Sequence, residues 1–325
     1  MGETDATDGF ERLRPRLFGI AYRMLGSADD AEDVVQEAYL RWHRAEREEV
    51  RAPEGWLVAV VTRLSIDRLR RLKTEREAYV GSWLPEPVAL PEEPGADRES
   101  ELASDLSLAF LLLLERLAPE ERAAFLLREV FDADYAEIAR VLEKSEAACR
   151  QMVHRARERI RSGRPRFRAP AEAKERLLGR FLAALAEGNK DELLSLFTED
   201  AVFVSDSGGK VPAARNVLVG PERIVRLFLG IERKYRGLIT HRLGVVNGEP
   251  AVLTYAAGRL AHVTSFAIET PGGDPGGRAA EGRIAAVYRV LNPDKLARVA
   301  RAVGAMTFGT DGPGGGQAAA DVAVW

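Results

Sequence analysis

The sequence predicts a multidomain chain in which two all-α domains precede one α+β domain. Through the first half of the chain, apolar residues recur at helical spacing. After about residue 170 the helices give way to short segments with strand-like patterning. Two polar segments separate these blocks: one acidic and proline-rich, the other basic. We therefore expect domains at 8–78, 106–164 and 170–307, a linker at 79–105 and a flexible glycine-rich tail at 308–325.

Composition allows packed cores but gives little hint of function by itself. Of the 325 residues, 46% are apolar and 30% are charged, and the net charge is −3. The charge is strongly segregated, however. Residues 150–168 hold eight Arg and one Glu, whereas residues 86–105 hold seven acids and one Arg. Because a binding face can be basic within an acidic chain, the local charges matter more than the average.

Cysteine content and hydropathy exclude several protein classes. The single cysteine, Cys149, cannot form an internal disulfide, and an inert buried thiol in a reducing compartment is the simplest interpretation. The N-terminus is acidic and polar, and no window approaches 18 uncharged apolar residues. Four dispersed histidines make no metal-ligand cluster. We expect a cytoplasmic protein with no membrane contact, metal or cofactor.

The first block reads as three helices with contrasting surfaces. The segment after Ser27 begins with acids in its first turn, and its exposed side stays acidic, which would repel DNA and favours a basic protein partner. The helix of residues 56–72 carries several Arg beside Trp56. Basic side chains among aromatics suit a melted DNA strand, because exposed bases stack on aromatic rings. Packing in the core is the alternative for both Trp42 and Trp56, and we favour it for Trp42.

The second block contains the sharpest local pattern. Residues 134–142 form a short amphipathic helix, residues 143–145 a tight turn, and residues 146–160 a second helix that Ser145 can cap. This is helix-turn-helix geometry, in which the second helix enters the major groove. One face of it presents Arg150, Gln151, His154 and Arg155, side chains suited to base edges, followed by arginines suited to phosphates. A solvated basic helix is the alternative.

The third block mixes helices and strands. Helices are expected at 171–186, 191–197 and 221–231, with a C-cap at Gly188-Asn189. Strands are expected at 201–204, 243–246, 251–256, 262–268 and 284–291. Helices followed by a run of antiparallel strands predict an α+β domain with a curved sheet.

Three segments in order resemble the extracytoplasmic-function sigma factors, the class without a middle domain. DAEDVVQEAYLRWHR resembles the region 2 segment that docks on the polymerase clamp, and PEGWLVAVVTRLSIDRLRR resembles the segment that melts and reads the −10 element. LAPEERAAFLLREVFDADYAEIARVLEKSEAACRQMVHRARERIR is similar to region 4, which reads the −35 element. The resemblance covers residues 10–162. It implies core RNA polymerase, through its β′ clamp and β flap, and promoter DNA as partners, with a free protein that is monomeric.

The resemblance implies a role for each matching residue. The clamp contacts would be Asp30, Asp33, Gln36, Glu37 and Arg41. The −10 contacts would be Trp56, Arg63, Asp67, Arg70 and Arg71. The −35 contacts would be Ser145, Arg150, Gln151, His154, Arg155 and Arg157.

Three further motifs resemble the subgroup that carries a fused SnoaL-like domain, a cone-shaped barrel of the nuclear-transport-factor-2-like type. They are the linker's WLPEP (83–87), SGGKV (207–211) and NPDKL (292–296). The resemblance implies that the fused domain modulates the sigma part through Trp83, Pro85, Lys210, Asn292, Asp294 and Lys295. The subgroup's glycine motif has an acid and three glycines, and Ser207 replaces one of them. Asn292-Pro293 is also an ordinary start signal for a helix.

Alternatives remain for the third domain. Folds of this kind host isomerases and cyclases, but Asp200, Asp206, Tyr255, His241 and His262 form no spacing-defined constellation. We therefore predict no catalytic residues and no enzyme, and a small-molecule sensor stays open as the alternative. The rival readings of the whole chain are an enzyme with a DNA-binding appendage and an ordinary helix-turn-helix repressor.

Overall fold

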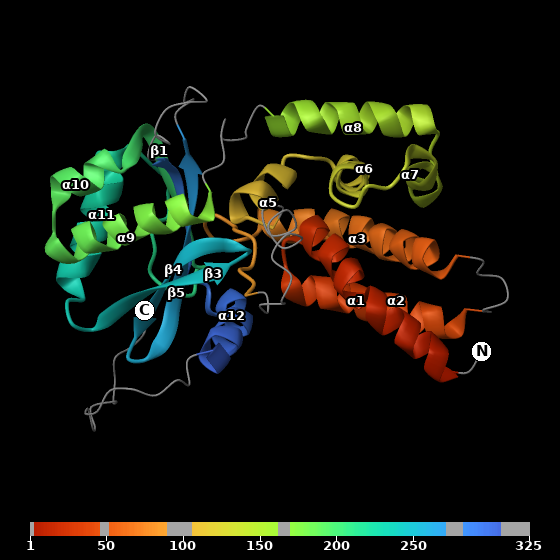
Figure 1. Ribbon diagram of the computed structural model, residues 1–325, viewed down its shortest axis with the longest axis horizontal. Helices are drawn as coiled ribbons and strands as arrows, with labels where there is room; N and C mark the ends of the chain where they lie inside the picture. Colours follow the sequence, from red (N-terminus) through yellow and green to blue (C-terminus); the bar gives the residue numbers. More distant parts are fainter. Residues whose placement is uncertain (1–2, 46–51, 90–105, 162–169, 271–281, 307–325) are drawn as a thin grey trace. The chain divides into compact units, whose positions relative to one another are not determined.

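Figure 1 shows the structure, a computed structural model that describes residues 3–45, 52–89, 106–161, 170–270 and 282–306. The chain forms two compact units. The first combines residues 1–78 with 110–164, and the second combines residues 79–109 with 165–325. In its described residues the first unit is helical, and the second contains a six-stranded sheet with helices.

Helices α1 (Glu3–Leu25), α2 (Ala28–Arg44) and α3 (Pro53–Glu77) pack together as the first helical domain. Gly26, in the left-handed region at φ 68°, ends α1, and the Ser27 hydroxyl caps α2 by accepting from the Asp30 amide at 3.2 Å. Trp42 is buried, as predicted, and its ring lies 5.7 Å from that of Trp56. The shared core includes Leu17, Ile20, Val35, Leu57 and Val61.

The second helical domain contains the predicted helix-turn-helix. Four helices follow one another: α5 (Leu108–Leu114), α6 (Pro119–Glu129), α7 (Tyr135–Leu142) and α8 (Glu146–Arg161). Asp134 caps α7 through the Glu137 amide (2.7 Å), and Ser145 caps α8 through the Ala148 amide (3.2 Å). Glu143 adopts the left-handed conformation between them, which makes the turn tight. Both α6 and α7 pack against α8 (Figure 1). Cys149 of α8 is buried.

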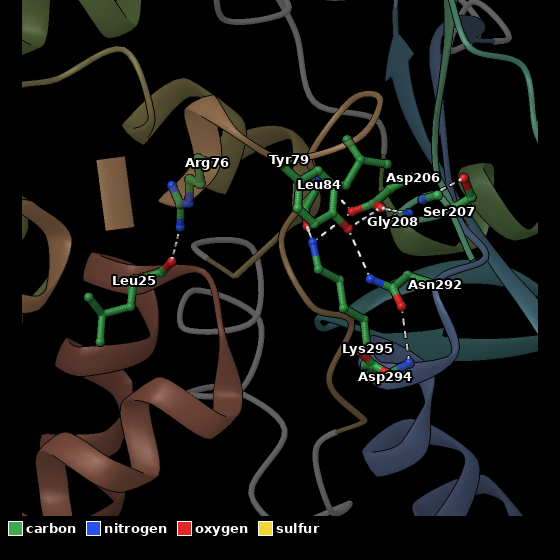
Figure 2. Close-up of polar contacts among 11 residues, drawn as sticks. Leu25, Arg76, Tyr79, Leu84, Asp206, Ser207, Gly208, Asn292, Asp294 and Lys295 are labelled. Atoms are coloured by element: carbon green, nitrogen blue, oxygen red, sulfur yellow. Dashed lines mark hydrogen bonds and ion pairs between the residues drawn. The ribbon is translucent and has the colours of Figure 1, made fainter. Parts of the chain in front are cut away.

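A buried ion network joins the two helical domains. The Arg122 guanidinium, 2% exposed, donates to the Met24 carbonyl at the end of α1 (2.6 Å) and to Glu115 (2.9 Å). Glu115 also pairs with Arg76, which donates to the Leu25 carbonyl at 2.6 Å (Figure 2). Burial lowers the pKa of Arg76. The network ties the ends of α1 and α3 to α6, so the two domains form one packed unit.

The sheet of the second unit has the order β2-β1-β6-β5-β4-β3. Its strands are β1 (Phe197–Asp206), β2 (Leu218–Val219), β3 (Ile239–Val246), β4 (Glu249–Ala256), β5 (Arg259–Glu269) and β6 (Arg283–Val290). Strands β3 to β6 are antiparallel, as predicted, but β1 pairs with β6 in parallel. The expected antiparallel run does not extend to this pairing, because β2 and the helix of residues 221–234 carry the chain from β1 to β3 at the far edge of the sheet.

Three helices cover one face of this sheet: α9 (Ala171–Glu187), α10 (Lys190–Ser195) and α11 (Pro221–Lys234) (Figure 1). Their apolar residues pack on β1, β5 and β6 around Phe181, whose ring meets those of Phe197, Phe228 and Phe266. Gly188 ends α9 at φ 71°, the predicted C-cap. Helix α12 (Pro293–Met306) follows β6 and packs near β5.

Candidate functional site

Part of the basic side of α3 contacts the helix-turn-helix. The Arg63 guanidinium donates to the carbonyls of Val141 (2.8 Å) and Arg140 (3.0 Å) at the end of α7, and it pairs with Glu143 at 3.1 Å. These carbonyls belong to the last turn of a helix, where oxygens lack intrahelical partners and carry partial negative charge. Arg63 therefore serves as a C-terminal cap for α7.

A second arginine of α3 strengthens the same contact. Arg70 pairs with Glu120 of α6 at 2.9 Å and with Asp67 of its own helix at 3.0 Å. Glu120 is also within 3.6 Å of Lys144 in the turn before α8. Arg71 is exposed and has no bond to any described residue, and Trp56 is half-buried against Trp42. Of the five predicted −10 contacts, Arg63, Asp67 and Arg70 thus already have partners within the unit.

Helix α8 presents the basic face that the spacing predicted. Arg150, Gln151, His154, Arg155 and Arg157 are all exposed, whereas Cys149, Met152, Val153 and Ala156 are buried on the opposite side. Arg155 pairs with Glu121 at 3.3 Å, and Arg157 pairs with Glu129 at 2.5 Å. Glu121 also pairs with Arg159. Intramolecular carboxylates thus pre-position part of this face, and Gln151 and His154 remain on the solvent side.

The acidic face of α2 is only partly as expected. Asp33 and Gln36 are exposed, and Glu37 pairs with Arg41 at 2.8 Å across one helical turn. Asp30 differs, because its carboxylate accepts from the Arg68 guanidinium at 2.7 Å and is largely buried. The sequence reasoning missed Leu40, which is 40% exposed and follows Asp33 and Gln36 along the same helical face.

In the second unit, the linker residues 79–89 lie against the sheet domain, and we call this segment the strap. The bonds that hold the strap converge on the Asp206 carboxylate at the end of β1 (Figure 2). Asp206 is fully buried. Four donors converge on it: the Tyr79 hydroxyl (2.6 Å), the Leu84 amide (2.9 Å), the Lys295 ammonium (2.6 Å) and the Gly208 amide (3.0 Å). Two donors come from the strap and two from the domain, so one carboxylate fastens the two together.

Lys295 and Asn292 complete this cluster from the other side. The Lys295 ammonium also donates to the Leu84 carbonyl at 2.5 Å and lies over the rings of Trp83 (4.4 Å) and Tyr79 (5.1 Å). Asn292 donates through Nδ2 to the Tyr79 oxygen at 2.9 Å, while its Oδ1 accepts from the Asp294 amide at 3.1 Å. Asn292 is therefore both a helix cap for α12 and a docking residue.

The glycine motif allows the close approach of the strap. Gly208 and Gly209 adopt φ of 58° and 72°, and a Cβ on Gly208 would lie 2.5 Å from the Asn292 amide nitrogen. A Cβ on Gly209 would meet Val80 of the strap at 3.0 Å. Ser207 has no positive φ, so serine is compatible with the backbone there. Lys210 pairs with Asp294 across the same edge.

The far end of the strap adds main-chain bonds. The Asn247 amide donates to the Val88 carbonyl at 2.7 Å, and the Val88 amide donates to the Asn247 side-chain oxygen at 3.2 Å. Leu84, Pro85, Glu86 and Val88 are buried along the way. Desolvation and the bond to Asp206 raise the pKa of Tyr79, so its hydroxyl stays protonated and donates across the ordinary pH range. Of these residues, the sequence reasoning did not find Tyr79, Leu84 or Asn247.

The candidate acid and base residues of the third domain have separate surroundings. Asp206 is fully occupied by the strap, and Asp200 is exposed. His241 donates through Nε2 to the Glu232 carboxylate (2.6 Å), and its Nδ1 lies 2.8 Å from the Thr254 hydroxyl. The ring of Tyr255 lies against the Arg242 guanidinium. His262 is buried, and desolvation together with Arg289 lowers its pKa well below the usual value. Among the residues that the structure covers, no three His, Cys, Asp or Glu side chains could hold a metal ion.

Comparison with known families follows the same division of the chain. Sigma-70 region 2 matches residues 10–75, Sigma-70 region 4 matches residues 107–160, and a SnoaL-like domain matches residues 178–299. The ECF RNA polymerase sigma factor SigJ of Mycobacterium tuberculosis is 39% identical over 304 residues, which is 88% of this chain and 92% of SigJ. The chain belongs to the ECF RNA polymerase sigma factors.

Other relatives agree with this membership. The probable ECF sigma factor SigI of M. tuberculosis is 32% identical over 289 residues, covering 87% of this chain and 92% of SigI. The crystal structure of the M. tuberculosis sigma factor SigJ superposes with a TM-score of 0.66 and 35% identity, over 90% of this chain and 98% of that one. Within the sigma factor, α1–α3 are thus region 2, α5–α8 are region 4, and α9 to α12 with the sheet are the SnoaL-like domain. No helix in the described ranges has the length and hydropathy to span a membrane.

Proposed function

We propose that this sigma factor binds core RNA polymerase and directs it to its own set of promoters in the cytoplasm. Region 4 supports this through the exposed basic face of α8, whose Arg, Gln and His side chains suit base edges and phosphates. The face formed by Asp33, Gln36 and Leu40 of α2 suits a basic surface of the polymerase clamp. Region 2 would contribute Trp56 and the arginines of α3 to the melted −10 strand.

The observation that carries the regulatory part is the engagement of α3 by region 4. Arg63 caps α7, and Arg70 pairs with Glu120, so two predicted −10 contacts are occupied by the protein itself. A promoter can use these side chains only after α3 and α7 separate. We therefore propose that the packed arrangement of regions 2 and 4 is a resting form, which opens on the polymerase.

The strap supports control within the same chain. It begins at Tyr79, one residue after the C-cap of α3 at Ala78, and it is held by Asp206, Lys295 and Asn247. The end of the −10 helix is therefore joined directly to a segment that the SnoaL-like domain binds. We propose that strap docking sets promoter output in cis, through Trp83, Pro85, Lys210, Asn292, Asp294 and Lys295.

Run-off transcription with core polymerase tests the sigma function, using the promoters of its own gene and of neighbouring genes. We expect a discrete transcript that Arg71→Ala and Gln151→Ala reduce, because both side chains are exposed on the predicted DNA faces. Arg116→Ala is the matched control, since Arg116 is an exposed arginine outside those faces. If no promoter gives a specific transcript, or the control loses as much as the two variants, the assignment of these faces is wrong.

The cis-acting role needs separate variants. Trp83→Ala removes the ring under the Lys295 ammonium, and a chain ending at residue 165 lacks the SnoaL-like domain altogether. We expect both to alter transcript yield while circular dichroism shows regions 2 and 4 still helical. Unchanged yield in both would contradict control by the strap. A small-molecule sensor in the SnoaL-like domain is the second candidate function, because the interior of that domain holds the buried Arg289.

A further inference from the structure

Arg289 places a positive charge inside the SnoaL-like domain. It lies near the end of β6, two residues after Val287 of the apolar core, so both side chains point to the face that α11 covers. Its neighbours across the sheet are Ser205 of β1 and Thr264 of β5. Only 5% of the residue is exposed.

The Arg289 guanidinium has little to balance its charge. One hydrogen bond, from Nε to the Thr264 hydroxyl, is long at 3.3 Å. The rings of Phe228 and Phe203 lie 4.5 and 5.4 Å from the guanidinium carbon. Within the described part of the chain, no carboxylate lies within the 4.0 Å of an ion pair. Since a guanidinium carries five N–H donors, most of them have no protein acceptor.

Burial of this kind is unfavourable unless a partner compensates it. Arginine is almost never fully buried without one. Desolvation lowers the pKa of Arg289 to about 10, partly offset by the charge of Glu232, so the side chain still carries its proton at neutral pH. Glu232 is already bound to His241 at 2.6 Å. The domain therefore holds a largely buried cation for which the described residues supply no ion-pair partner.

The surroundings are suited to an anion with an apolar body. The rings of Phe203 and Phe228 lie beside the guanidinium, and Thr264 on β5 bonds to it. His262 lies beside Thr264 on the same strand. His262 stays neutral because desolvation and the charge of Arg289 both oppose its protonation. One cation with a planar fork of donors matches one carboxylate, which it can bind bidentately, better than a doubly charged phosphate.

We propose that the interior of the SnoaL-like domain binds a small organic acid, whose carboxylate pairs with Arg289 and whose apolar part lies against Phe203 and Phe228. The proposal concerns binding alone: among the described residues, no carboxylate forms an ion pair with Arg289, so its charge is left for a ligand to balance. The proposal goes beyond the control by the strap and does not depend on it, because its test measures binding alone.

Thermal unfolding and titration calorimetry of the full chain test the site with benzoate and acetate as probes. Benzamide and acetamide are the matched neutral probes, and sodium chloride holds ionic strength constant. We expect benzoate to raise the melting temperature more than acetate, and the two amides to have no effect. Arg289→Met, close in size but neutral, should weaken benzoate binding by at least about tenfold. Arg289→Lys keeps the charge without the fork and should bind with intermediate affinity.

The ligand-free variants separate a binding role from a structural one. If Arg289 is kept for a ligand, Arg289→Met removes a desolvated charge, and its melting temperature should equal or exceed that of the parent chain. The proposal is overturned if benzoate and benzamide act alike, or if Arg289→Met binds benzoate as the parent does. It is also overturned if Arg289→Met melts earlier and the parent gains nothing from benzoate.

Discussion

Tyr79→Phe removes a single hydroxyl from the strap and leaves the ring in place. The lost bond joins the phenol to the buried Asp206 carboxylate at 2.6 Å, and the change also deprives the Asn292 amide of its acceptor. A hydrogen bond to a charged group contributes about 1.5–3 kcal/mol. Since 1.4 kcal/mol corresponds to a factor of ten, the strap should open roughly 10–100 times more often.

Amide hydrogen exchange read by mass spectrometry measures that opening directly. The Leu84 amide donates to Asp206 and the Val88 amide to Asn247, so both report on docking. In Tyr79→Phe their protection should fall by that factor, while peptides of β4 and β5 keep theirs. Tyr255→Phe is the matched control, because the Tyr255 hydroxyl has no hydrogen bond among the described residues. Equal protection of the strap in both variants would refute Asp206 as the fastening point.

Three more changes test other parts of the structure. Glu120→Gln weakens the pair with Arg70, which joins α3 to region 4, whereas the pair with Lys144 lies within region 4. Since one exposed pair contributes at most about 1 kcal/mol, run-off yield should rise by no more than about fivefold, and a decrease would contradict the resting form. Gly208→Ala and Gly258→Ala both place alanine at a positive φ, but only the Cβ at 208 clashes, against Asn292. Gly208→Ala should therefore lower the free energy of unfolding in urea by about 2 kcal/mol more than Gly258→Ala does. Burial keeps His262 neutral in the folded chain, whereas in the unfolded chain its imidazole binds a proton below about pH 6.5. The free energy of unfolding should therefore decline as the pH falls below that value, by up to about 1.4 kcal/mol per pH unit. His262→Gln should flatten this decline and the exposed His154→Gln should not; equal slopes in all three proteins would show that another group is responsible.

Sequence patterns predicted those parts of the fold that depend on interactions between residues close together in the chain. The helix-turn-helix follows from apolar spacing, the caps at Asp134 and Ser145 and the tight turn between them, all of which lie within a few residues of one another. The end of α9 at Gly188 follows from the same kind of signal. These features need no knowledge of distant parts of the chain.

Distant partners could not be predicted in the same way. Arg63 looks like a DNA-binding residue in sequence, and only the fold brings it to the carbonyls of α7, more than seventy residues away. Asp206 was a candidate catalytic acid in the sequence, because no nearby residue indicates that Tyr79 and Lys295 bind its carboxylate. Arg289 sits in a strand whose alternation is compatible with an exposed side chain, so its burial became visible only with the sheet register.

The strap also changes how far regions 2 and 4 can move apart. The chain between Ala78 and Leu106 comprises roughly 27 residues, enough to reach about 90 Å when fully extended. The strap takes up residues 79–89. The chain from there to Leu106 comprises roughly 16 residues, whose fully extended length is about 55 Å. Undocking would lengthen the tether and lower the effective concentration of one region near the other. If the strap controls promoter output as proposed, the Asp206 carboxylate would limit the distance between two regions of the sigma factor without contacting either of them.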